Sequence, residues 1–111
     1  MQAGSTMNDS EYHQLADELL NNLQDAIDEV EFDLDYESAG GIVEVIFPNG
    51  TQIIVNKQAP LHQIWVATKA NGHHFEFKDG QWIDNRGGSE FWALLTEAAT
   101  RQAGEPITLA I

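Results

Sequence analysis

The chain has 111 residues, with 18 Asp and Glu against five Lys and Arg, a formal net charge of −13 and no cysteine. This length is typical of one domain with its own hydrophobic core. The strong negative charge argues against nucleic acid or an anionic membrane as a partner. Without cysteine, the chain cannot carry persulfide sulfur or hold an iron–sulfur cluster by thiolates.

The first six residues, MQAGST, precede a second methionine and resemble a leader or a cloning remnant. We therefore expect one domain over residues 7–111. The start of the chain lacks the positive and apolar segments of a secretory signal, and no apolar run is long enough to span a bilayer. These features predict a cytoplasmic protein.

Apolar residues at helical spacing predict a first helix that ends near Val30, with Asn8 or Ser10 as its cap. A second helix is predicted from a cap at Ser89 to about Ala103, before Gly104. Between the helices, alternating patterns and turn residues predict six strands, over 32–38, 42–47, 52–56, 63–68, 74–78 and 82–84.

This order of elements, with short turns, predicts an α+β fold: a two-layer α–β sandwich whose antiparallel sheet has about six strands and both helices on one face. After the second helix, Ile107, Leu109 and Ile111 alternate with other residues. They either add an edge strand or cover the gap between the helices.

Acidic residues dominate the boundary between the first helix and the first strand. The helical spacing changes there to a period of two, with Phe32, Leu34 and Tyr36 pointing away from the acids. The two sets of acids should form one continuous surface, which we call the acidic ridge: Asp25, Asp28, Glu29, Glu31, Asp33, Asp35 and Glu37.

The acidic ridge has two interpretations. It is either a solvated face that keeps the protein soluble, or a docking surface for hard cations or a basic partner. Carboxylates suit iron, manganese, calcium and magnesium. Because exposed carboxylates do not form a closed cage, we expect weak, multiple and poorly selective binding.

Asp9, His13 and Asp17 share a face at the start of the first helix and are a second candidate metal group. Such spacing is common on surface helices, which favours an ordinary polar helix start instead. Trp65 is a candidate interaction anchor if Ile64 and Val66 fill the core and Trp65 stands on the uncovered face of the sheet. The pattern alone leaves the opposite arrangement equally open.

The chain resembles the frataxin family in its central motif and, at both ends, the family's bacterial CyaY branch. The resemblance covers residues 7–109. The residues that carry it are Asn56-Lys57-Gln58, Pro60, Gln63-Ile64-Trp65, Ala67-Thr68, Gly72, Phe75, Phe77 and Trp82, with MNDSEYHQLAD at 7–17 and EFWALLTEAATRQAGE at 90–105.

The resemblance implies a frataxin-like fold and a role in iron–sulfur cluster assembly. It implies that the acidic ridge binds Fe²⁺ or Fe³⁺, for which other divalent or trivalent cations can substitute. It also implies docking to an IscS-like cysteine desulfurase and to its scaffold protein, and exposure of Trp65. The residues expected at the partner surface are Glu18, Asp28, Glu29, Asp33 and Trp65.

These expectations favour a non-enzymatic, iron-binding regulator or iron chaperone that is a monomer and that metal ions can drive into oligomers. One alternative is an iron-storage or iron-oxidising protein, although no inward-facing Glu-x-x-His motif of the di-iron kind is visible. Another is an acidic adaptor for which metal binding is incidental.

Overall fold

The computed structural model describes residues 7–111, so the prediction of a leader or cloning remnant at 1–6 lies outside the described residues. No helix in the described part is long and apolar enough to cross a membrane. The elements are α1 (Asp9–Glu29), β1 (Asp35–Ala39), β2 (Ile42–Ile46), β3 (Gln52–Gln58), the 3₁₀ helix η2 (Ala59–Leu61), β4 (Gln63–Ala67), β5 (Gly72–Lys78), β6 (Gln81–Asp84) and α2 (Phe91–Ala103).

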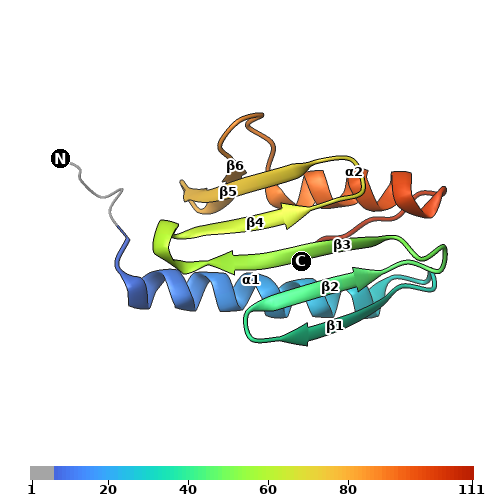
Figure 1. Cartoon of the computed structure of the whole chain (residues 1–111), viewed down its shortest axis with the longest axis horizontal. Coiled ribbons are helices and arrows are strands. Elements are labelled where there is room, and N and C mark those ends of the chain that lie inside the picture. The colour runs from blue at the N-terminus through green and yellow to red at the C-terminus, as the bar shows by residue number, and fades with distance from the viewer. Residues whose placement is uncertain (1–6) are drawn as a thin grey trace.

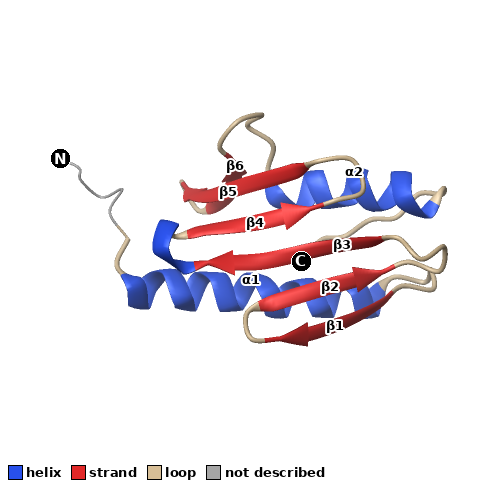
Figure 2. Ribbon diagram, in the orientation of Figure 1, coloured by secondary structure: helices blue, strands red, loops and turns tan. Residues whose placement is uncertain are grey.

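The strands form one antiparallel sheet in chain order, from β1 at one edge to β6 at the other. Both helices lie behind this sheet in Figure 1, with α1 behind the early strands and α2 behind the later ones; Figure 2 shows the same two layers by element type. The predicted α+β sandwich with two helices on one face is therefore confirmed.

A capping box starts α1. The backbone N–H of Glu11 donates to the side chain of Asn8 at 2.8 Å, and the backbone N–H of Asn8 donates to Glu11 at 3.2 Å. One turn later, buried Tyr12 donates its hydroxyl hydrogen to the carbonyl oxygen of Gln63 at 2.7 Å. This bond ties the start of α1 to the start of β4.

Alternation along the strands gives the sheet two distinct faces. One face packs against the helices and supplies the core residues Val43, Val45, Ile53, Val55, Ile64, Val66, Phe75 and Trp82. The other side, which neither helix covers, we call the open face; it carries Glu44, Ile54, Trp65 and His74.

The first strand begins later than predicted, at Asp35 instead of Phe32. Within residues 7–111 the strand pairs only with β2, whose last paired residue, Ile46, lies opposite Asp35. The residues before Asp35 therefore find no strand to pair with in this part of the chain. The backbone N–H of Leu34 instead donates to the carbonyl oxygen of Phe32 at 2.8 Å.

The predicted cap of the second helix is also corrected. Glu90, not Ser89, caps α2, accepting hydrogen bonds from the backbone N–H groups of Trp92 and Ala93. Ser89 is still held to β6, because its carbonyl oxygen accepts from the backbone N–H of Asp84 at 2.8 Å.

The residues after α2 form no strand and return between the two helices (Figure 1). Ile107 and Leu109 are buried. The hydroxyl of Thr100 accepts from the backbone N–H of Ile107 at 3.0 Å and donates to its carbonyl oxygen at 3.1 Å. The hydroxyl of Thr96 makes the same two bonds to Leu109. Of the two predicted arrangements, the tail adopts the one that covers the gap between the helices.

Candidate metal and partner-binding surface

All seven carboxylates of the acidic ridge are exposed. Asp25, Asp28 and Glu29 lie on the last turns of α1, and Glu31 and Asp33 lie on the join to β1. The two acids on β1, Asp35 and Glu37, point to the open face, because Tyr36 between them pairs with buried Val45. The acidic ridge therefore runs from α1 around the edge of the sheet.

A direct contact joins the helix and strand parts of the acidic ridge. The hydroxyl of Tyr36 lies 3.5 Å from Oδ2 of Asp28. Burial raises the pKa of Tyr36, and the negative charges of Asp28, Asp25 and Asp35 raise it further. Three ridge carboxylates therefore act on one phenol, although Tyr36 lies on the apolar side of β1 and packs against the core.

Within residues 7–111, no ridge carboxylate takes part in an ion pair; the ion pairs found there are Asp17–Lys57, Asp9–His62, Asp84–His73 and Glu97–Arg101. No basic side chain of the described residues therefore offsets the negative charge of the acidic ridge by direct contact. Such a surface attracts cations and basic partners.

Glu44 extends the acidic surface onto the open face. It lies opposite Glu37 in the ladder between β1 and β2. The predicted site omitted Glu44, although the turn at Gly40-Gly41 could have identified it. A two-residue turn there places Ala39 opposite Ile42, and counting back along both strands places Glu37 opposite Glu44.

The described residues contain no group of three or more His, Asp or Glu side chains placed to hold one metal ion. Ions at the acidic ridge would therefore meet separate exposed carboxylates and keep much of their water. This donor chemistry suits hard cations such as Fe²⁺, Fe³⁺, Ca²⁺ and Mg²⁺ and discriminates poorly among them.

The structure does not bring Asp9, His13 and Asp17 together around one position. Asp9 accepts from Nε2 of His62 at 2.7 Å, whereas Asp17 accepts from Nζ of Lys57 at 2.6 Å. Each acid is thus directed to a different loop or strand, and we do not retain these three residues as a metal site.

The predicted partner residues lie on more than one side of the molecule. Glu18 lines a cleft with Trp92 and Ile111, whereas Asp28 lies beside Tyr36 of β1. Ten helical positions separate Glu18 from Asp28, which corresponds to ~80° around α1 and ~15 Å along it. Glu18 therefore does not belong to the acidic ridge.

Trp65 stands on the open face, because its neighbours Ile64 and Val66 are buried under the helices. The Trp65 ring stacks on His74 with centroids 4.4 Å apart, and its Nε1 donates to Oε1 of Gln63 at 2.7 Å. These contacts hold the indole in one orientation, so its predicted placement on the uncovered face is confirmed.

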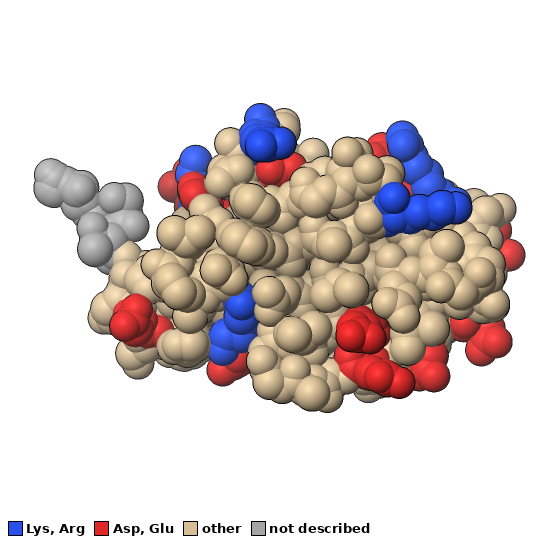
Figure 3. Space-filling view, in the orientation of Figure 1, with Lys and Arg blue, Asp and Glu red and all other residues tan. Residues whose placement is uncertain are grey.

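Figure 3 shows the open face from the front. Acidic side chains gather at one corner of the view, over β1 and β2, and few charged side chains cover the middle of the face. Trp65 and Glu44 lie on strands separated by β3, a lateral spacing of ~10 Å. A partner lying across this face can contact the indole and the strand part of the acidic ridge together.

The frataxin-like domain family model matches residues 5–105 of the chain. The chain is 60% identical to "Iron-sulfur cluster assembly protein CyaY" of Pseudoalteromonas atlantica, covering 92% of this chain and 94% of the relative. It is 52% identical to the protein of the same name from Tolumonas auensis, covering 93% and 99% of the two chains.

The solved structure of frataxin from Psychromonas ingrahamii matches the fold with a TM-score of 0.87 and 43% sequence identity. That match covers 95% of this chain and all of the solved one. The chain belongs to the frataxin-like family, in its CyaY branch.

Proposed function

We propose that this protein is a non-enzymatic, iron-binding regulator of iron–sulfur cluster assembly. It binds Fe²⁺ or Fe³⁺ weakly on the acidic ridge and docks there on a cysteine desulfurase. The observation that carries the proposal is a set of seven exposed carboxylates without an ion pair in the described part of the chain. The names of the two CyaY relatives supply the pathway.

Iron binding would use carboxylate oxygens and retained water. Each bound cation reduces the repulsion among the carboxylates next to it. This favours several weakly bound ions over one tightly bound ion. Other divalent or trivalent cations would substitute, because exposed oxygen donors impose little size or geometry selection.

Docking would combine charge with an aromatic anchor. A basic groove on the desulfurase complements the acidic ridge, and charge complementarity makes such association fast and salt-sensitive. The indole of Trp65, held by His74 and Gln63, offers the assembly machinery, including a scaffold protein, a rigid apolar contact on the open face.

Charge reversal tests the docking surface. Replacing Asp28, Glu29 and Asp33 with Lys should abolish binding to the desulfurase in a calorimetric or surface-binding titration. The matched control reverses three exposed acids outside the acidic ridge, Asp9, Asp79 and Glu97, and so changes the net charge equally. Unchanged affinity in the ridge variant, or equal loss in the control, would refute docking through the ridge.

A further inference from the structure

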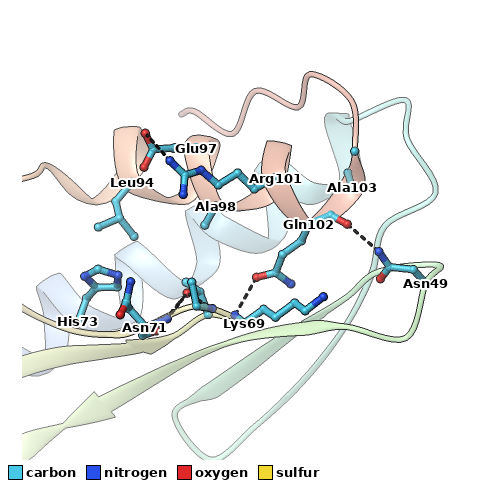
Figure 4. Close-up of a pocket in the computed structure, with 13 residues that line it drawn as sticks. Asn49, Lys69, Asn71, His73, Leu94, Glu97, Ala98, Arg101, Gln102 and Ala103 are labelled. Carbon is cyan, nitrogen blue, oxygen red and sulfur yellow. Dashed lines mark hydrogen bonds and ion pairs between the residues drawn. The ribbon is translucent and has the colours of Figure 1, made fainter.

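A pocket of about 640 Å³ lies between the turn that joins β4 to β5 and the C-terminal half of α2 (Figure 4). This volume falls within the ~300–1,000 Å³ typical of small-molecule sites. Three charged residues line it: Lys69 and Arg101, which are two of the five basic residues of the chain, and Glu97, which does not belong to the acidic ridge.

Partly buried hydrogen bonds fix the wall of this pocket. Gln102 is 8% exposed, and its side chain accepts from the backbone N–H of Lys69 while donating to Thr51 and to the carbonyl of Gln52. Its own carbonyl oxygen accepts from the side chain of Asn49 at 2.7 Å. The β4–β5 turn, the β2–β3 turn and α2 are therefore held together whether or not the pocket is occupied.

The strand side of the pocket includes His73. Its Nδ1 is engaged by Oδ2 of Asp84 at 3.0 Å, and Asp84 is 6% exposed. This contact fixes the imidazole ring and leaves Nε2 as the ring nitrogen available to a ligand. The helix side of the pocket offers apolar surface from Leu94 and Ala98.

The two basic side chains are available for a ligand. Within the described residues Lys69 makes no ion pair, and Arg101 has only a 3.9 Å contact with Glu97 in which both side chains are about 70% exposed. Exposed pairs of this kind contribute little to stability, so the guanidinium can exchange that contact for another. Figure 4 shows Lys69 extending toward Asn49, and Arg101 toward Glu97 at the other end of the pocket.

We propose that this pocket binds a small anion that carries at least two carboxylate or phosphate groups. One acidic group contacts Lys69 and Asn49, and another contacts Arg101 and Asn71. The carbon body of an organic ligand such as citrate lies on Leu94 and Ala98. The ligand needs two acidic groups because Lys69 and Arg101 lie at different ends of the pocket. The planar guanidinium matches a carboxylate or phosphate in a bidentate manner.

The test uses metal-free, isotope-labelled protein at constant ionic strength, titrated with citrate, pyrophosphate and acetate. We expect citrate or pyrophosphate to cause saturable amide shifts at residues 69–73 and 98–103, and acetate to cause none that saturate. The double variant K69Q/R101Q should weaken binding at least about tenfold, because it removes two charge-assisted contacts.

Two further variants separate the pocket from general charge. K78Q/R86Q removes the same charge outside the pocket and should leave the affinity unchanged, whereas A98F should fill the pocket and abolish binding without altering charge. The proposal is overturned if neither citrate nor pyrophosphate binds saturably, if acetate binds as well, if both double variants lose equal affinity, or if A98F binds like the parent protein.

Discussion

Glu37 of β1 lies directly opposite Glu44 of β2, and within the described residues neither carboxylate is paired with a basic group. Like charges in opposed positions of an antiparallel ladder destabilise it. The fold therefore retains a local repulsion at the place where the acidic ridge reaches the open face. This arrangement is expected of a surface that serves binding at some expense of stability.

Replacing Glu44 with Lys should convert this repulsion into an attraction across the ladder. We expect the free energy of unfolding to rise by ~0.2–1 kcal/mol in urea denaturation. The control is Glu18→Lys, which makes the same charge change at an exposed position of α1 outside the acidic ridge. An equal gain from Glu18→Lys would mean that net charge, and not the Glu37–Glu44 contact, is responsible.

Tyr36 should report the charge of the acidic ridge. Its pKa is raised by burial and then by Asp28, so Asp28→Asn should lower the pKa of Tyr36 toward the ordinary value near ~10. Ring-labelled tyrosine spectra recorded against pH resolve Tyr36 from Tyr12. Glu18→Gln, on another side of α1, should leave the pKa of Tyr36 unchanged.

Calcium, which remains soluble at alkaline pH, extends this measurement to cation binding. Cations on the acidic ridge offset the nearby negative charge and should lower the pKa of Tyr36 as well. If neither Asp28→Asn nor calcium changes the pKa of Tyr36, the charges of the acidic ridge do not influence the phenol.

Asp84 should make stability depend on acid pH. Burial by itself raises the pKa of Asp84, but hydrogen bonds from the Arg86 backbone N–H and from His73 outweigh burial and lower it. A carboxyl with a lowered pKa stabilises the fold fully above its unfolded pKa of ~3.9, and this contribution is lost as pH falls through the folded pKa.

Asp84→Asn should therefore lower the free energy of unfolding by roughly 1–3 kcal/mol at neutral pH. The difference from the parent protein should shrink as pH falls below about 4. Denaturant titrations across this range measure it, with exposed Asp79→Asn as the control. A difference that stays constant down to low pH would mean that the ionised state of Asp84 does not stabilise the fold.

The tail after α2 should be essential to stability. Leu109 is 1% exposed between the helices, so Leu109→Ala should cost ~2–5 kcal/mol in the free energy of unfolding. Ile111 is 81% exposed, and Ile111→Ala should change that free energy by less than about 0.5 kcal/mol. Thermal unfolding of the two variants measures both changes. Equal losses of stability would contradict the packing described for the tail.

Local patterns predicted the architecture well, because helical spacing and turn residues act over a few neighbouring positions. The Gly40-Gly41 turn fixes the β1–β2 register in this way. The start of β1 was missed because strand length depends on a partner: Phe32 and Leu34 alternate correctly, but the β2 ladder ends opposite Asp35.

Contacts between side chains that are distant in the chain could not be predicted from the sequence. Asp9 meets His62 across 53 positions and Asp17 meets Lys57 across 40, and no local pattern encodes either pairing. The face occupied by Trp65 was equally open, since Ile64, Trp65 and Val66 are all apolar. Packing of the helices against Ile64 and Val66 determines which face the indole takes.

The most direct test of the proposed function is sulfide production by the cysteine desulfurase with its scaffold protein, titrated with this protein in the presence and absence of Fe²⁺. The proposal predicts an iron-dependent change in rate that the variant with Lys at positions 28, 29 and 33 does not produce. An unchanged rate at saturating protein, with and without iron, would contradict the regulatory role and leave iron storage or delivery as the better explanation.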